Sequence, residues 1–160
     1  MKIGVRGHDY GRHGVAEYAA LLHGEGYDTV QLEVPKAITG VNSFDEITPA
    51  LLDEIRAEFE KQKVEIGVFS CYMDLSNTDD EARRKAVETF CRGLSYAKSA
   101  GAKMTGTETS YEHLGPLEKQ RRFPYMMDSL KRITEEAERL SVQIGLEPVA
   151  FHPLEDMETA

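Results

Sequence analysis

Residues 142–153, which read VQIGLEPVAFHP, contain the side chains best placed in this sequence for ligand chemistry. Apolar residues at 142, 144 and 146 predict a strand, and Glu147 follows that strand directly, in front of Pro148. Proline cannot donate to a strand ladder and disfavours helical geometry in the residue before it, so the strand must end near Glu147. Ligands bind at the carboxyl ends of parallel strands in α/β proteins. The sequence therefore predicts a ligand-binding carboxylate at Glu147. His152, five residues further on, can turn back over the same end of the strand.

Four earlier apolar segments, at residues 3–6, 29–34, 64–69 and 103–107, also predict strands that run into polar residues. In a closed barrel the carboxyl ends of all strands meet at one mouth. A polar group at five successive strand exits is therefore stronger evidence of a site than any one of them alone. The residues at the first four exits, in chain order, are Arg6, His8 and Asp9; Glu33 and Lys36; Cys71, Tyr72 and Asp74; and Thr107 and Glu108. Glu147 and His152 follow the fifth strand.

Structural interpretations of these side chains stay open. His8 and Asp9 are also typical of turns, and His152 could satisfy a local hydrogen bond. Glu108 is as compatible with a solvated loop as with a substrate contact. Ordinary loop charges are the favoured interpretation of the Glu33 and Lys36 pair. Cysteine nucleophiles need a basic partner or a helix N-terminus, and neither is evident beside residue 71.

Helical periodicity between the strands predicts four helices that would position these residues. Thr48 followed by Pro49 is a typical N-cap and first helical residue. Thr78 and Glu81 form a capping-box pattern for the third helix. The fourth helix runs to about residue 140, and residues 154–160 resemble the first turns of a fifth helix.

The resulting order is (βα)₄β, for which two architectures are possible. A doubly wound sheet is disfavoured because no Gly-x-Gly-x-x-Gly pattern follows the first strand. We therefore predict an α/β fold of the (β/α)₈ TIM barrel type, represented here by about the first five strands and four helices. No linker divides the chain, so residues 1–160 are predicted to form a single domain, a partial barrel.

Composition limits the partners of this domain. The 160 residues are 41% apolar and 29% charged, which is typical of a globular protein. A net charge of −9 argues against nucleic acid, and no apolar run is long enough to span a membrane. Cys71 and Cys91 show no disulfide or metal-binding pattern, so a cytoplasmic location is expected.

A family resemblance is carried by four segments of the sequence. They read VRGHD, VQLEVPKAITG, the run from FSCYMDLSNTDD to AKMTGTET, and IGLEPVAFHP. The chain resembles the N-terminal portion of the xylose isomerase-like sugar phosphate isomerase/epimerase barrels. The resemblance implies a divalent metal (Mn, Mg, Co or Zn) held by Glu, Asp, His and Glu from strands five to eight. Glu147 matches the first of these ligands. The other three are expected beyond Ala160, which would leave the metal site incomplete in this chain.

The same resemblance implies that the substrate is a small sugar or sugar phosphate. In such isomerases and epimerases a proton α to a carbonyl is removed, and an enediolate forms beside the metal. Glu147 would then be both metal ligand and catalytic residue, and His8, Glu108 and His152 would bind substrate.

A non-catalytic half-barrel that serves as a binding or assembly module is the alternative. An open barrel exposes two sheet edges, so we expect a homo-oligomer or pairing with a second chain that covers them. A DNA-repair endonuclease of the same superfamily is disfavoured by the acidity of the chain.

Overall fold

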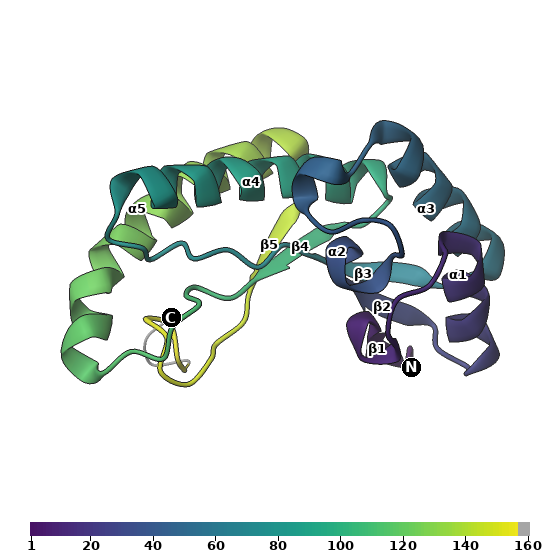
Figure 1. Cartoon of the computed structure of the whole chain (residues 1–160), viewed down its shortest axis with the longest axis horizontal. Coiled ribbons are helices and arrows are strands. Elements are labelled where there is room, and N and C mark those ends of the chain that lie inside the picture. The colour runs from purple at the N-terminus through teal and green to yellow at the C-terminus, as the bar shows by residue number, and fades with distance from the viewer. Residues whose placement is uncertain (157–160) are drawn as a thin grey trace.

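A computed structural model describes residues 1–156, and its core is one five-stranded parallel sheet (Figure 1). The strand order in the sheet is the order of the strands in the chain. All neighbours pair in parallel, as in the registers Val5 with Val30 and Thr105 with Ile144. All five carboxyl ends therefore lie along one edge. The strands are β1 (Gly4–Arg6), β2 (Thr29–Leu32), β3 (Glu65–Ser70), β4 (Met104–Thr107) and β5 (Gln143–Leu146).

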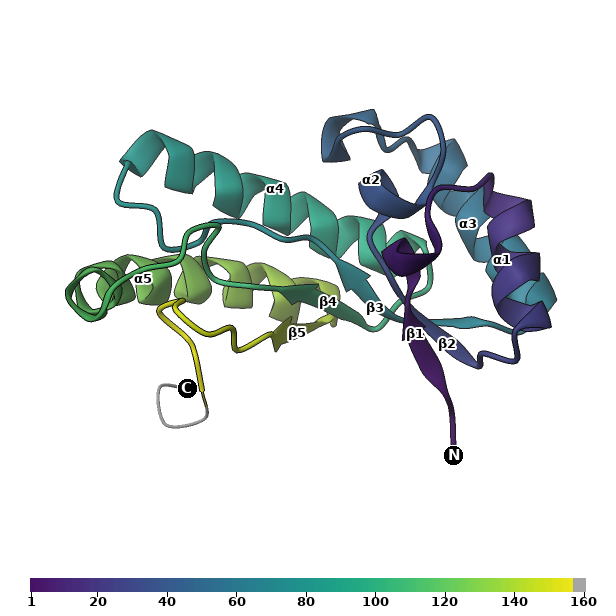
Figure 2. The same ribbon diagram turned by 60° about the horizontal axis from the view of Figure 1, so that its bottom comes forward.

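Four long helices connect the strands and lie along one side of the sheet, as Figures 1 and 2 show. They pack in sequence, α1 on α3, α3 on α4, and α4 on α5. Within residues 1–156, no helix covers the other side of the sheet, and none is long and apolar enough to cross a membrane. The long helices are α1 (Val15–Gly24), α3 (Pro49–Gln62), α4 (Asp80–Ser99) and α5 (Pro116–Leu140); the short ones are η1 (Gly7–Tyr10), α2 (Val34–Ala37) and η2 (Phe44–Glu46).

Two helix starts show how the sequence sets these elements. At α3 the prediction is confirmed, because the Thr48 hydroxyl accepts a hydrogen bond from the Leu51 N–H at 3.3 Å and Pro49 is the first helical residue. At α4 the predicted capping box at Thr78 is wrong. Asp79 is the N-cap, and its carboxylate accepts from the Ala82 N–H at 2.7 Å. Aspartate caps helices as well as threonine does, and here it stands one residue closer to the helix.

The hydrophobic core lies between the sheet and the helices. Helical spacing places the predicted apolar residues of α1 and α3 on the buried side. In α4 the buried stripe includes Val87, Phe90, Leu94 and Ala97, whereas Ala82 in the first turn is exposed. The largest fully buried side chains include Tyr18, Leu22, Leu32, Ile55, Phe59, Phe69, Phe90 and Leu94.

Glycines in the sheet allow side chains of adjacent strands to lie across them. A Cβ at Gly106 of β4 would be 2.7 Å from Cγ1 of Val68 on β3. A Cβ at Gly145 of β5 would be 2.9 Å from Sδ of Met104 on β4. Both distances are far below van der Waals contact. Only glycine therefore fits these positions while Val68 and Met104 keep their places.

Three segments differ from the sequence-based expectation. β2 ends at Leu32, and Pro35 lies in the short helix α2 instead of ending a longer strand. β5 is only half buried, because it is the outermost strand on its side of the sheet. Residues 154–156 form no helix, and the rest of the predicted fifth helix, residues 157–160, lies outside the described residues.

Candidate active site

Hydrogen bonds hold together the segments that leave β3, β4 and β5. The Met73 N–H donates to the Thr107 hydroxyl at 3.1 Å. The Glu147 N–H donates to the Thr107 carbonyl at 2.9 Å. Further out, the Leu114 N–H donates to the Phe151 carbonyl at 2.9 Å. These bonds fix the three exits side by side, and their segments extend together from the sheet in Figure 1. We refer to the space above the five strand exits as the mouth.

Glu147 stands at the mouth where the sequence predicts it, one residue beyond the end of β5. Its side chain is exposed, and its carboxylate makes no hydrogen bond or ion pair with residues 1–156. The hydrogen-bonded Asp9 raises the pKa of Arg6, burial raises the pKa of Tyr72, and the negative charge of Glu147 adds to both rises. The same charge opposes the lowering of the pKa of His8. Arg6 ends β1 and His8 follows it, at the opposite edge of the sheet. The sheet therefore curls enough for the first and last exits to interact electrostatically.

His8 lies in η1 with its side chain only 14% exposed, and its Nδ1 is 3.9 Å from the Glu33 carboxylate. Burial lowers the pKa of His8, and the positive charges of Arg6 and Lys36 lower it further. Nδ1 is buried and finds no hydrogen-bond partner in the described part of the chain. A neutral imidazole is thus held against a carboxylate beside the mouth, with a ring nitrogen left for another partner.

Glu33 is buried, which differs from the favoured expectation of an ordinary loop charge. Burial raises the pKa of its carboxyl group, and the ion pair with Lys36, at 2.9 Å, opposes that rise. A charge removed from water needs such a partner, because an unpaired buried carboxylate is costly. Lys36, which remains half exposed, is therefore the counter-ion of Glu33.

Glu108 and His152 belong to the same electrostatic neighbourhood. Glu108 is half buried, and its negative charge acts on Glu33, Tyr72 and His152. His152 is 3% exposed, and burial lowers its pKa. Like His8, it has a buried Nδ1 for which residues 1–156 supply no hydrogen-bond partner. Glu147, His8, Glu108 and His152 thus all follow strand ends of the same sheet, and burial lowers the pKa of both histidines.

Gln31 and Tyr72 also lie in this region, and the sequence indicates only part of their arrangement. The Gln31 amide donates to the Tyr72 hydroxyl at 2.7 Å and to the Ser70 hydroxyl at 3.1 Å. Lys36 Nζ lies 5.0 Å from the centre of the Tyr72 ring. A polar residue between Val30 and Leu32 indicates a side chain that faces away from the core. The partners of Gln31, Ser70 at the end of β3 and Tyr72 just beyond it, could not be inferred without the register of the sheet.

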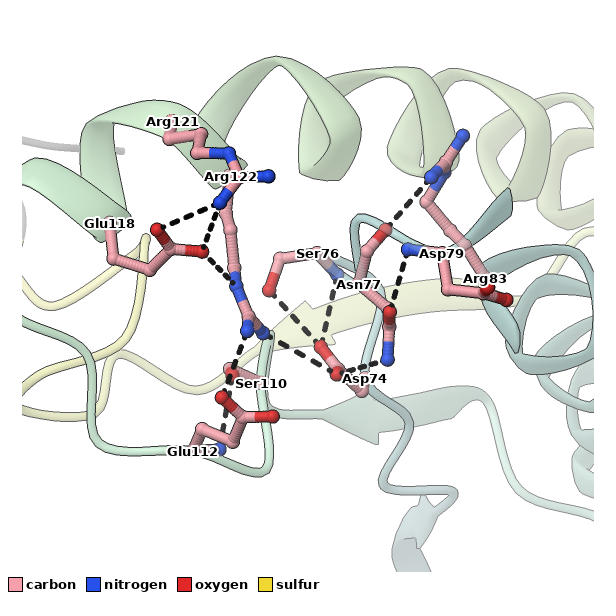
Figure 3. Close-up of polar contacts among 10 residues, drawn as sticks. All are labelled: Asp74, Ser76, Asn77, Asp79, Arg83, Ser110, Glu112, Glu118, Arg121 and Arg122. Carbon is pink, nitrogen blue, oxygen red and sulfur yellow. Dashed lines mark hydrogen bonds and ion pairs between the residues drawn. The ribbon is translucent and has the colours of Figure 1, made fainter. Parts of the chain in front are cut away.

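Arg122 of α5 is the centre of a polar cluster that includes residues of the loops after β3 and β4, as Figure 3 shows. Its guanidinium is surrounded by three carboxylates: Glu112 at 2.8 Å, Glu118 at 3.1 Å and Asp74 at 3.7 Å. Asp74 also accepts hydrogen bonds from Ser76 at 3.1 Å and from Asn77 at 3.0 Å. The loops after β3 and β4 are thereby fixed to one helix.

Pro124, inside α5, lies between this cluster and the rest of the helix. It has no N–H to donate, so one helical hydrogen bond is missing and the helix can bend there. Figure 1 shows α5 curving over its first turns, away from the line of its later ones. Arg122 belongs to those first turns.

The side chains that could ligate a metal do not gather at one point in the described part of the chain. Among residues 1–156, no three His, Cys, Asp or Glu side chains come together as a metal-binding group. Glu147 has the chemistry of a ligand for a hard divalent cation, since it is a free carboxylate at a strand exit. The described residues therefore offer one ligand and do not form a complete site.

A family model described as the xylose isomerase-like TIM barrel matches residues 19–160. The predicted partial barrel is confirmed by this match and by the parallel sheet. Among curated proteins, none matches the sequence.

Solved structures share the fold at low sequence identity. The 3-keto-D-glucoside 4-epimerase YcjR from E. coli is 15% identical, with a TM-score of 0.75 over 95% of this chain and 57% of that one. A D-psicose 3-epimerase from Clostridium cellulolyticum H10, crystallised with D-tagatose, is 16% identical, with a TM-score of 0.73 over 90% of this chain and 51% of that one. A xylose isomerase-like protein from Mycobacterium smegmatis, in complex with magnesium, is 15% identical, with a TM-score of 0.72 over 99% of this chain and 58% of that one. This chain spans about half the length of these proteins.

Proposed function

This chain belongs to the xylose isomerase-like TIM barrel family, and on that basis we propose that it works in divalent-metal-dependent isomerisation or epimerisation of a small sugar. The reaction class is proton transfer at the carbon next to a carbonyl, through an enediolate. Glu147 is the proposed catalytic residue and metal ligand. His8, Glu108 and His152 are the proposed substrate-binding residues.

The observation that supports this proposal is that charged groups at the five strand exits influence one another electrostatically. Glu147 interacts electrostatically with groups that follow β1 and β3, and Glu108 with groups that follow β2, β3 and β5. Sugars present many hydroxyl groups, so a site for them needs several hydrogen-bonding side chains from different directions. Fold neighbours that are sugar epimerases support the same assignment.

Each proposed residue has a physical reason for its role. Glu147 is exposed and unpaired within the described chain, so its carboxylate is available to accept a proton from carbon. His152 is buried and His8 is half-buried, and desolvation lowers the pKa of both, so they are neutral at pH 7 and can both donate and accept hydrogen bonds. Glu108 adds an acceptor whose charge acts on His152.

A divalent metal would stabilise negative charge on the substrate oxygens. The described residues supply Glu147 toward it and no three-residue cluster. The remaining ligands of a full coordination sphere must come from elsewhere than residues 1–156. Mn, Mg, Co and Zn all accept carboxylate and imidazole ligands, and the choice among them remains a prediction.

Hydrogen exchange tests the proposal directly. The chain is incubated with MnCl₂ and D-fructose or D-tagatose in D₂O, and loss of the proton next to the carbonyl is followed by NMR. We expect exchange with the unaltered chain and none with Glu147→Gln, which keeps the shape and loses the base. Glu138→Gln, on the exposed surface of α5, is the matched control. Equal exchange in Glu147→Gln and the unaltered chain would overturn the assignment.

A non-catalytic binding or assembly module is the second candidate, favoured by the incomplete ligand set. β1 and β5 are the outer strands of the sheet, and their outward backbone groups have no strand partner within residues 1–156. We propose that a second copy or another chain covers these edges, because exposed strand edges promote association. Sugar binding without exchange, together with a dimer or larger species in light scattering, would support this candidate. A monomer at high dilution would count against the association.

A further inference from the structure

A cavity of about 420 Å³ opens beside the mouth, and nothing in the proposed reaction uses it. We propose that this side pocket binds a second, glycosidically linked sugar ring, so that the substrate is a glycoside or disaccharide and not a free monosaccharide. This inference rests on the proposed function. The residues that carry the argument are Glu33, Lys36, Asp45, Tyr72, Met73 and Tyr111, all of which line the side pocket.

The side pocket is continuous with the mouth through shared residues. Glu33 lines the side pocket and also faces His8, at 3.9 Å. Tyr72 lines it with Lys36 over its ring, and its hydroxyl is bonded to Gln31 of β2. A ligand that contacts His8 at the mouth can therefore extend past Glu33 and Tyr72 without leaving the protein surface. This is the path that a substituent on the reacting sugar would follow.

Tyr111 provides the platform for the second ring. It is 65% exposed, yet its hydroxyl donates to the Tyr72 carbonyl at 2.8 Å and lies 3.8 Å from the Met73 sulfur. An exposed aromatic ring is normally mobile, whereas this one is tied at its far end. A ring held in place with its surface open to solvent suits the apolar C–H face of a sugar, which loses little entropy when it stacks there.

Charge in the side pocket favours a neutral ligand over a phosphate. Lys36 provides the ammonium group, and it is already paired with Glu33 at 2.9 Å. The second carboxylate, Asp45, is paired with Arg92 at 2.6 Å. Each charge thus has its counter-ion, and a phosphate would meet two carboxylates for one lysine. Among sugar derivatives, a neutral glycosyl group fits this balance best.

The space available is sufficient for a second ring. The side pocket falls within the range of about 300–1,000 Å³ that is usual for small-molecule sites. A further cavity of about 250 Å³ is also lined by Tyr111 and Met73.

Binding of three related sugars tests the inference. Dissociation constants of D-fructose, maltulose (glucosyl-fructose) and fructose 6-phosphate are measured by ligand-observed NMR titration on the full chain. We expect maltulose to bind about tenfold more tightly than fructose, which is the upper end for an added aromatic contact. Tyr111→Ala should remove this advantage and leave fructose binding unchanged, and Tyr111→Phe should keep much of it. Phe123→Ala, an exposed aromatic residue on α5 outside the side pocket, is the control.

The outcomes separate this inference from the proposed function. If fructose binds and maltulose is no tighter, or if Tyr111→Ala weakens both sugars equally, the side pocket is not a sugar site, and the function stands. Tighter binding of fructose 6-phosphate than of maltulose, lost in Lys36→Ala, would instead identify an anion site and overturn the inference. If no sugar binds at all, both proposals fail. Circular dichroism of each variant confirms that the fold is retained.

Discussion

Arg122 of α5 and Asp74 of the loop after β3 form an ion pair of 3.7 Å in which both side chains are about nine-tenths buried. They are far apart in the sequence, and no periodic pattern connects them. Figure 3 shows that this pair is the centre of a cluster that joins α5 to the loops after β3 and β4. A buried charge that loses its partner is strongly unfavourable, so this pair is a point where stability and site geometry depend on one contact.

Arg122→Ala should lower the free energy of unfolding by about 3 kcal/mol, because Asp74 would keep a buried charge without its counter-ion. Urea denaturation followed by circular dichroism measures the change. The adjacent Arg121→Ala is the control, since Arg121 is 65% exposed and pairs only with Glu118 among the described residues. Its loss should cost less than about 1 kcal/mol. Equal effects of the two substitutions would show that the Asp74 pair does not stabilise the loops.

Gly106→Ala should also destabilise the chain, for a steric reason. The added Cβ would lie 2.7 Å from Val68 Cγ1, so either the strand or Val68 must move. Overpacking of this kind typically costs about 1–3 kcal/mol. The double variant Gly106→Ala/Val68→Ala should recover part of the loss. Gly24→Ala, where the new Cβ meets nothing within 4 Å, should cause none. Failure of Val68→Ala to relieve the effect would contradict the clash.

Stability should fall as the pH drops below about 6.5, the ordinary pKa of histidine. Burial lowers the pKa of His152 in the folded chain. The unfolded chain therefore takes up a proton first, and stability that is present above pH 6.5 is lost as the pH falls toward the folded pKa. Denaturation at pH 7, 6 and 5 should give a shallower pH dependence for His152→Gln than for the unaltered chain. His23→Gln, on the surface of α1, should leave the dependence as it is.

The two cysteines should differ in reactivity. Cys71 is fully buried, and burial raises the pKa of its thiol well above the ordinary range. Cys91 is half exposed. Ellman's reagent at pH 8 should modify one thiol in the folded chain and the second only in denaturant. Cys91→Ser should abolish the reaction of the folded chain, and a fast reaction that persists in that variant would mean that Cys71 is accessible.

Features set by local sequence were predictable. Apolar spacing placed the buried faces of α1 and α3, and Pro148 placed the end of β5 at Leu146. Both depend on residues that are close together in the chain. The cap of α4 was missed because Thr78 and Asp79 are both good N-caps, and only the loop geometry chooses between them.

Contacts between distant residues could not be predicted in the same way. The strand-exit rule placed Glu147, His8, Glu108 and His152 after strands, but burial of Glu33 and the position of Tyr111 depend on how loops from different strands pack. Arg122 lies on α5, a helix on which the sequence patterns predicted no site residue. Charged residues at intervals of three or four along an exposed helix give no sign of which one will turn inward.

Because the strands lie in the sheet in chain order, each strand after the first pairs with one that precedes it in the sequence. During synthesis on a ribosome, every newly emerged strand therefore meets a template that already exists, and the sheet can assemble vectorially from its N-terminal side. Among the strands of residues 1–156, no pairing must wait for a distant later segment or be broken to admit one.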